Sequence, residues 1–263
     1  MNRFIPLLAI IVMLPLFGLG CPEKPDSLVE QEEQARQELK VIDARGSGDC
    51  AHDYYPLLPD YSITYRNTSG DEQTEYTMTV VEASDTAAKM EFTFTEDEEM
   101  AGELTFTQEL ACSGGNLLPQ GYLDMSSAFG DVKISIETEN VEGILLPHLF
   151  EDGTTWETSY DLTITPEEGT FPMAGFGSLR SAVSLANSVV AEETITVSAG
   201  TFDTLKVEVV TTTVTEIPGM PASVPPTESA VISYQWWAKD VGLVKMENSD
   251  GSSTTEAVEV FVP

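Results

Sequence analysis

Apolar and polar residues alternate with a period of two in many short segments of this chain, a pattern typical of half-buried β-strands. The clearest case is residues 193–214, where two alternating runs flank a short connection, 198–201. Gly200 reverses the chain there at little cost, because glycine adopts positive φ without a Cβ clash. We therefore predict an antiparallel hairpin over 193–214, with these apolar side chains on one face: Ile195, Val197, Leu205, Val207 and Val209.

Comparable alternation recurs about every 10 to 15 residues as far as the C-terminus, with turn-forming residues between the runs. Gly242 is the second glycine that we assign to a structural turn. Segment 181–192 fits a helical face as well as a strand, and its β-branched residues favour the strand. The pattern predicts a mainly β fold with little helix. We expect an antiparallel sheet of roughly ten or more strands, as a curved open half-barrel or a sandwich.

Residues 1–20 have the features of a signal peptide, because Arg3 precedes a short apolar run that prolines and glycine interrupt. The run ends in Gly18-Leu19-Gly20-Cys21, which resembles the lipobox of bacterial lipoproteins. That resemblance implies that Cys21 is lipidated and anchors an exported protein to a membrane of the cell envelope, with the β domain outside the cytoplasm. The alternative is an ordinary secretory signal in which this cysteine is incidental.

The remainder divides by composition into a polar, acidic segment, 21–49, and an apolar-rich segment, 50–263. We predict a tether for the first and a single antiparallel β domain for the second. Leu57-Leu58-Pro59 is echoed by Leu145-Leu146-Pro147, and each motif is followed by a polar turn and an aromatic-bearing strand. This repetition leaves open a domain of two related halves that meet near residues 125–140.

Three cysteines are present, and two remain for the folded part if Cys21 carries lipid. An even pair in an exported protein predicts a disulfide between Cys50 and Cys112. The alternative is a pair of reactive or metal-binding thiols. His52 alone beside Cys50 does not make a metal-ligand spacing.

The chain is strongly acidic, with a formal net charge of -32 from 44 acidic and 12 basic residues. Such a surface repels polyanions, so we predict no nucleic-acid partner. The densest acidic run, residues 96–99, fits a solvated turn. Adaptation to salt and loose cation binding both remain open, and no calcium-loop motif or other metal site is recognisable.

Catalytic motifs are missing from the sequence. The two histidines, His52 and His148, accompany no nucleophile elbow and no metalloprotease motif. We therefore predict no catalytic residue, no cofactor and no enzyme activity. The best candidates for ligand contact are aromatic residues, although tryptophans in alternating strands usually belong to the core. They are Trp156, Tyr234, Trp236 and Trp237.

Trp236 and Trp237 are adjacent in the sequence, so in a strand their side chains point to opposite faces. One of the two must therefore face away from the main core. It is either covered by other residues or exposed in a groove.

Two longer motifs carry a family resemblance. They are Val197-Ser-Ala-Gly-Thr-Phe202 and Trp236-Trp-Ala-Lys-Asp-Val-Gly-Leu-Val244. Together they resemble the TapB-type family of exported bacterial proteins. The resemblance implies a curved antiparallel sheet like that of lipoprotein-carrier proteins, whose concave face holds acyl chains.

The sequence thus leads to two expectations about function. The first is a membrane-anchored, non-enzymatic lipoprotein that binds an apolar or lipid-like ligand on a concave sheet face. The alternative is a structural or adhesive surface lipoprotein that acts through an envelope protein partner and has no small-molecule ligand.

Overall fold

Alternating strands make up almost all of the structure, as the period-two pattern predicts. The computed structural model describes residues 45–94, 104–129, 132–166, 178–218 and 225–263. The N-terminal segments 1–20 and 21–44, Cys21 and the acidic run 96–99 lie outside these residues. The described elements are η1 (Gly48–Cys50), a 3-10 helix, and the strands β1 (Ser62–Ser69), β2 (Glu72–Ala83), β3 (Ala87–Phe94), β4 (Leu104–Ser113), β5 (Asn116–Phe129), β6 (Val132–Gly143), β7 (Thr155–Pro166), β8 (Leu179–Val197), β9 (Gly200–Glu216), β10 (Thr227–Ala238), β11 (Gly242–Asn248) and β12 (Ser253–Phe261).

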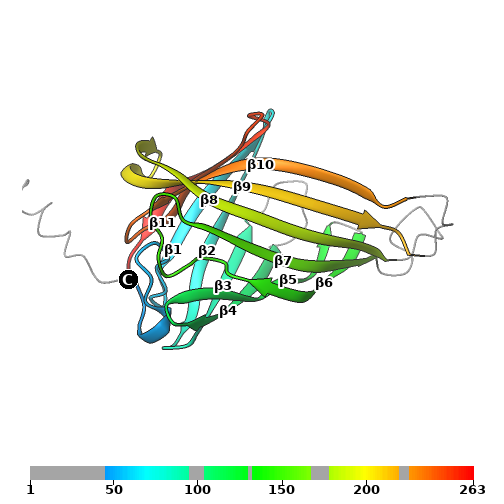
Figure 1. Cartoon of the computed structure of the whole chain (residues 1–263), viewed down its shortest axis with the longest axis horizontal. Coiled ribbons are helices and arrows are strands. Elements are labelled where there is room, and N and C mark those ends of the chain that lie inside the picture. Colours follow the sequence, from blue (N-terminus) through cyan, green and yellow to red (C-terminus); the bar gives the residue numbers. More distant parts are fainter. Residues whose placement is uncertain (1–44, 95–103, 130–131, 167–177, 219–224) are drawn as a thin grey trace, which may run out of the picture. The chain divides into compact units, whose positions relative to one another are not determined.

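These strands form one antiparallel sheet in which each strand pairs with its neighbours in the sequence (Figure 1). The prediction of a mainly β, antiparallel fold is confirmed. The sequence left a half-barrel and a sandwich open, and the pairing of β1 with β12 closes the sheet into a barrel. Segment 181–192, which fitted either a helix or a strand, lies within β8.

β5 is the strand that the sequence pattern did not predict. Its residues include Pro119, Gly121 and a run of small polar side chains, so apolar positions do not alternate over its length. Its register with β4 shifts twice, between Thr107 and Glu109 and again at Leu110. Partners on the neighbouring strands, rather than local sequence, therefore define this strand.

Strand register determines which residues share the inner face of the barrel. Ile63 of β1 lies opposite Met78 of β2, and Met78 lies opposite Phe92 of β3. Directly paired residues lie on the same face of a sheet. Because Ile63 is 1% exposed and belongs to the hydrophobic core, this face is the inner one.

One end of the barrel is covered by two segments that are not strands, residues 45–60 and 144–154. We call this end the capped end, and we call residues 45–60 the capping segment. The first segment is the blue loop at the lower left of Figure 1. The predicted disulfide is present, joining Cys50 of η1 to Cys112 of β4. The second segment is hydrogen-bonded to β5 through the Leu117 amide, which donates to the Leu146 carbonyl at 2.9 Å. We call the opposite end, where β9 ends and β10 begins, the distal end.

The two glycines assigned to turns have positive φ, 150° at Gly200 and 103° at Gly242. Gly200 pairs with Val197 at the end of the β8–β9 hairpin, where the chain reverses. At Gly242 an added Cβ would lie 3.3 Å from Cδ of Pro56, so the glycine also lets β11 approach the capping segment.

Candidate ligand-binding site

A row of aromatic side chains crosses the inner face of β1 to β4. Ring centroids are 5.2 Å apart for Tyr65 and Tyr76, 5.0 Å for Tyr76 and Phe94, and 4.9 Å for Phe92 and Phe106. Phe94 and Phe106, at 5.6 Å, complete the row. Tyr65 is buried, but the other four rings are only half-buried.

The row also has a structural role, because cross-strand aromatic pairs stabilise a sheet by roughly 0.5–1.5 kcal/mol each. That role does not require the rings to remain accessible. A barrel of about eight strands is just filled by side chains, whereas wider barrels enclose ligand cavities. This barrel has twelve strands, and four of the five rings in the row keep part of their surface accessible to solvent.

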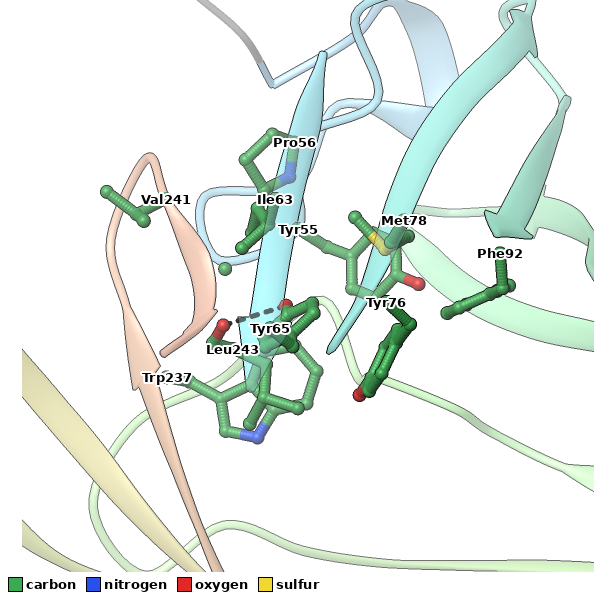
Figure 2. Close-up of a pocket in the computed structure, with 11 residues that line it drawn as sticks. Tyr55, Pro56, Ile63, Tyr65, Tyr76, Met78, Phe92, Trp237, Val241 and Leu243 are labelled. Carbon is green, nitrogen blue, oxygen red and sulfur yellow. Dashed lines mark hydrogen bonds between the residues drawn. The ribbon is translucent and has the colours of Figure 1, made fainter. Parts of the chain in front are cut away.

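The row leads into an apolar cavity of about 120 Å³ beneath the capping segment (Figure 2). The cavity lies between β1, β2, β3, the turn from β10 to β11, and the segment that contains Tyr55. Its lining residues are Tyr55, Pro56, Ile63, Tyr65, Tyr76, Met78, Phe92, Trp237, Val241, Gly242 and Leu243. Except for three tyrosine hydroxyls and one indole N–H, the side chains of this lining are apolar.

The hydroxyls differ in their partners. Tyr65 donates to the Leu243 carbonyl at 2.9 Å, which ties β1 to β11 (Figure 2). Among the described residues, the hydroxyls of Tyr55 and Tyr76 form no hydrogen bond, and neither oxygen is fully enclosed. Burial raises the pKa of Tyr76 to about 12 and that of Tyr55 further still, so both stay neutral at physiological pH. They can serve as hydrogen-bond donors to a ligand.

The predicted tryptophan contacts separate into different environments. Trp237 lines the cavity, packs against Tyr55 at 5.9 Å, and donates its indole N–H to Gln235. Trp156 lies at the capped end, packs edge-on against Phe150 at 5.6 Å, and is not part of the cavity lining.

Trp236 and Tyr234 lie on the opposite face of β10, away from the cavity. The Lys206 ammonium stands 4.9 Å from the Trp236 ring and 4.7 Å from the Tyr234 ring, and Lys245 stands 4.7 Å from Trp236. Trp236 is the tryptophan that faces away from the barrel interior, and these lysines cover it in cation–π contacts. Among the described residues its indole N–H has no hydrogen-bond partner.

The residues that the sequence analysis missed come from the first half of the chain: Tyr55, Tyr65, Tyr76, Met78 and Phe92. Their alternation identified them as strand or lead-in residues, but nothing local shows that they meet. The signal available in the sequence was the density of aromatic residues at alternating positions between 54 and 94.

Six strands, β1, β3, β7, β8, β9 and β10, carry no charged side chain on the inner wall over the stretches given at the end of this paragraph. Charged residues occupy the alternate, outward positions there, as with Arg66, Glu157 and Lys206. Solvent reaches part of this wall, since Val231 faces the interior by its pairing with Thr211 and is still 49% exposed. The stretches are 63–69, 88–94, 156–164, 181–189, 205–215 and 227–237.

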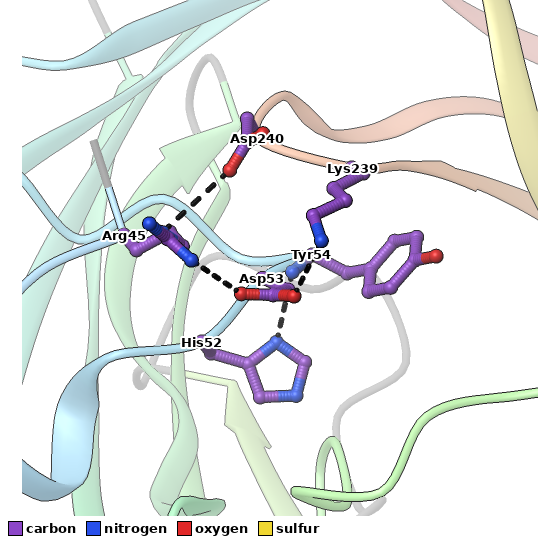
Figure 3. Close-up of polar contacts among 6 residues, drawn as sticks. All are labelled: Arg45, His52, Asp53, Tyr54, Lys239 and Asp240. Carbon is purple, nitrogen blue, oxygen red and sulfur yellow. Dashed lines mark hydrogen bonds and ion pairs between the residues drawn. The ribbon is translucent and has the colours of Figure 1, made fainter. Parts of the chain in front are cut away.

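The capping segment is fastened to the turn between β10 and β11 by ion pairs (Figure 3). Asp53 accepts from Arg45 at 2.9 Å and from Lys239 at 2.8 Å, and its backbone carbonyl accepts from the Asp240 amide at 2.7 Å. The hydrogen bond from Lys239, and then that from Arg45, hold the pKa of Asp53 below its usual value. Exposed pairs of this kind contribute little singly, about 0–1 kcal/mol.

His52 fastens the same segment from its buried side. Its Nε2 lies 3.0 Å from the Pro147 carbonyl, and its Nδ1 accepts the Tyr54 backbone N–H at 3.1 Å. This arrangement requires a neutral ring that carries its proton on Nε2. Burial lowers the pKa of His52 below its usual 6.5.

Acidification should therefore destabilise the packing of the capping segment, residues 45–60. The pKa of His52 is lower in the folded than in the unfolded chain. Its contribution to the free energy of unfolding is therefore fully present above pH 6.5 and is lost as the pH falls below that value. We expect the melting temperature of the parent to fall more between pH 7.5 and 5.5 than that of His52→Gln. Titration of the many carboxylates is common to both proteins and cancels in the comparison. Parallel curves would contradict this assignment.

The described ranges contain neither a metal-ligand cluster nor a membrane-spanning helix. No group of three or more His, Cys, Asp or Glu side chains there is arranged to hold a metal ion. None of the helical structure in the same ranges has the length and apolar character that a membrane crossing requires.

Residues 60–259 match the DUF3108-like family, and the chain belongs to that family. The matched residues cover the β strands of the chain. The match does not confirm the TapB-type family, which remains an interpretation of two motifs. No match to this chain was found among curated proteins.

Two crystal structures share the fold. One is a predicted lipoprotein of Parabacteroides distasonis, with a TM-score of 0.53 and 16% identity over 80% of this chain and 99% of the other. The second is a predicted exported protein of Bacteroides fragilis with a YmcC-like fold, with a TM-score of 0.51 and 15% identity over 80% of this chain and all of the other. At this identity the likeness concerns the fold.

Proposed function

We propose that this protein is an exported, membrane-anchored binding protein that holds an apolar or lipid-like ligand inside its barrel and catalyses no reaction. The observation that carries the proposal is the half-buried aromatic row, which continues into an apolar cavity of about 120 Å³. Apolar concave sites with a few polar groups are the usual form of a small-molecule site. The mouths of β-barrels are a frequent place for them.

Export and anchoring are supported by two independent observations. The first is the sequence Gly18-Leu19-Gly20-Cys21 after an apolar run. The second is that the two proteins of similar fold are a predicted lipoprotein and a predicted exported protein. Lipid chains on Cys21 would hold the barrel at a membrane surface without a spanning helix.

The binding proposal is tested by what the protein retains on purification. The full chain carrying Cys21→Ser, purified without detergent, should show an additional small mass in native mass spectrometry, and organic extraction should recover it as an apolar molecule. It should also bind the neutral apolar dye Nile red. A chain that carries no such molecule and leaves the dye unbound would favour the alternative, a structural or adhesive lipoprotein that acts through protein partners.

Filling the cavity should abolish most of this binding. Leu243 lines the cavity, so Leu243→Trp places a larger side chain in the space that a ligand would occupy. We expect Nile red affinity to fall at least tenfold, with an overpacking cost of about 1–3 kcal/mol in stability. The matched control is Leu149→Trp, because Leu149 is 62% exposed and lies outside the cavity. Equal affinity of the two variants would place the bound dye elsewhere.

The anchor is tested separately. In cells, Cys21→Ser should move the protein from the membrane fraction to the soluble fraction, because the thiol is the predicted attachment point of the lipid. Continued membrane association of the variant after a high-salt wash would contradict lipidation at Cys21.

A further inference from the structure

The inner face of β9 changes character along the length of the strand. Near the capped end it is apolar, with Leu205, Val207 and Val209 buried on β9. Further along the same strand the inward positions are the threonines Thr211, Thr213 and Thr215, and their partners on β10 are Val231, Ser229 and Thr227. These distal residues are half-buried or exposed: Thr211, Thr213, Thr215, Ser229 and Ser233.

On β9 and β10 the distal wall is polar without being charged, whereas the inward residues beside it on β8, Leu185 and Val183, are apolar. Half-exposed positions can carry lysine or glutamate at little cost, since such side chains keep their charge in water. This chain has 56 charged residues, the sum of 44 acidic and 12 basic, and places none of them on the inner wall of the six stretches defined above. The hydroxyl groups there can donate and accept hydrogen bonds but cannot neutralise an ion.

The cavity is too small to enclose a whole lipid. An apolar cavity of about 150 Å³ holds a molecule the size of benzene, and this cavity measures about 120 Å³. It can therefore take only the end of an acyl chain or a similar group. The remainder of such a ligand would lie in the barrel interior beyond the cavity, along the inward side of β10 from Trp237 towards Ser229.

An anionic ligand is opposed both outside and inside the barrel. The net charge of -32 repels anions as they approach. Inside, a carboxylate or phosphate would lose water without meeting a cation on the inner wall of the six stretches, which is costly for a charged group. A neutral polar group avoids both penalties and can hydrogen-bond with the threonines and serines.

We propose that the barrel selects an uncharged amphiphile, with its apolar end in the cavity at the capped end and its neutral polar end among the hydroxyl side chains towards the distal end. This inference rests on the proposed function and adds the chemical class and the orientation of the ligand. The ligand class is a single-chain lipid with a hydroxyl-bearing head, such as a monoacylglycerol.

The test uses the full chain carrying Cys21→Ser and three brominated probes, because bromine quenches tryptophan fluorescence on contact and Trp237 lines the cavity. The probes are 1-dodecanoylglycerol brominated at carbons 11 and 12, the same lipid brominated at carbons 2 and 3, and 11,12-dibromododecanoate. We expect saturable quenching by the first lipid, weaker quenching by the second, and at least tenfold weaker binding of the anionic fatty acid at pH 8. Trp237→Phe should remove most of the quenching.

A charge placed on the inner wall should invert the selectivity. Thr213 faces inward and its neighbour Thr212 faces outward, so Thr213→Lys and Thr212→Lys form a matched pair. We expect Thr213→Lys to improve dodecanoate binding at least fivefold relative to the glyceride, and Thr212→Lys to leave the ratio unchanged.

The possible outcomes separate this inference from the proposed function. If dodecanoate binds the parent as tightly as the glyceride, the preference for a neutral ligand is wrong, although ligand binding stands. Equal quenching by the two brominated glycerides would overturn the orientation. If no probe quenches and displacement of Nile red detects no binding, the proposed function fails together with the inference.

Discussion

Replacing Gly143 with alanine is expected to be among the most damaging single substitutions in the barrel. Gly143 ends β6 with φ of 91°, and an added Cβ would lie 2.2 Å from the backbone carbonyl oxygen of Glu157 on β7. That oxygen accepts the Ile144 N–H at 3.1 Å, so relieving the clash would break a hydrogen bond between the strands. The obstacle is backbone, which cannot move aside as a flexible side chain could.

The expected loss has two parts. A non-glycine residue at positive φ costs roughly 1–3 kcal/mol, and forcing extra volume into a packed site costs about 1–3 kcal/mol more. In a domain of this size each kcal/mol lowers the melting temperature by roughly 2–4 °C. We therefore expect Gly143→Ala to melt on the order of 10 °C below the parent in a thermal scan followed by circular dichroism.

Gly153→Ala is the matched control for this substitution. Gly153 also has a positive φ, 79°, but an added Cβ there meets nothing within 4 Å. It should show the cost of backbone strain without the clash. If Gly143→Ala loses no more stability than Gly153→Ala, then β6 and β7 do not approach as closely as the structure has them.

Removal of the disulfide is expected to have an effect of similar size. Cys50 and Cys112 are 62 residues apart in sequence, and closing such a loop stabilises the folded state by about 4 kcal/mol in the chain-entropy model. The double variant Cys50→Ala/Cys112→Ala should therefore melt on the order of 10 °C below the parent. Both cysteines are buried, so alanine leaves no unpaired polar group behind.

Reduction supplies an independent check of the same bond. Dithiothreitol should lower the melting temperature of the parent towards that of the double variant and leave the double variant unchanged. Two thiols that alkylate freely in the native parent would contradict the bond. Because it joins η1 to β4, its loss should also weaken Nile red binding at the capped end.

The strands themselves could be predicted because their signal is local. Ile195 and Val197, or Leu205 and Val207, alternate with polar residues, and a period of two has one regular interpretation. β5 escaped prediction because its sequence has no such period, so its pairing with β4 and β6 defines it. The requirement for glycine at position 143 could not be predicted for a different reason. No sequence pattern indicates how closely the backbone of β7 approaches this residue.

The candidate site shows the same division. The sequence identified Trp237 as a possible ligand contact together with Trp236, and required them to face opposite ways. It did not show which of them faces the interior. That depends on the register of β10 with β9, where Trp237 pairs with the buried Leu205 and Trp236 pairs with Lys206.

The sequence by itself determined the mainly β class, the positions of most strands, the pairing of Cys50 with Cys112, and an acidic chain without a recognisable catalytic motif. These follow from local periodicity, parity and composition, which need no knowledge of distant contacts. Only the tertiary structure decided that β1 meets β12, that residues 45–60 cap one end, and that Tyr65, Tyr76 and Phe92 form one surface. Those features arise from pairing between strands far apart in the chain, where the free energy depends on register and closure rather than on any single segment.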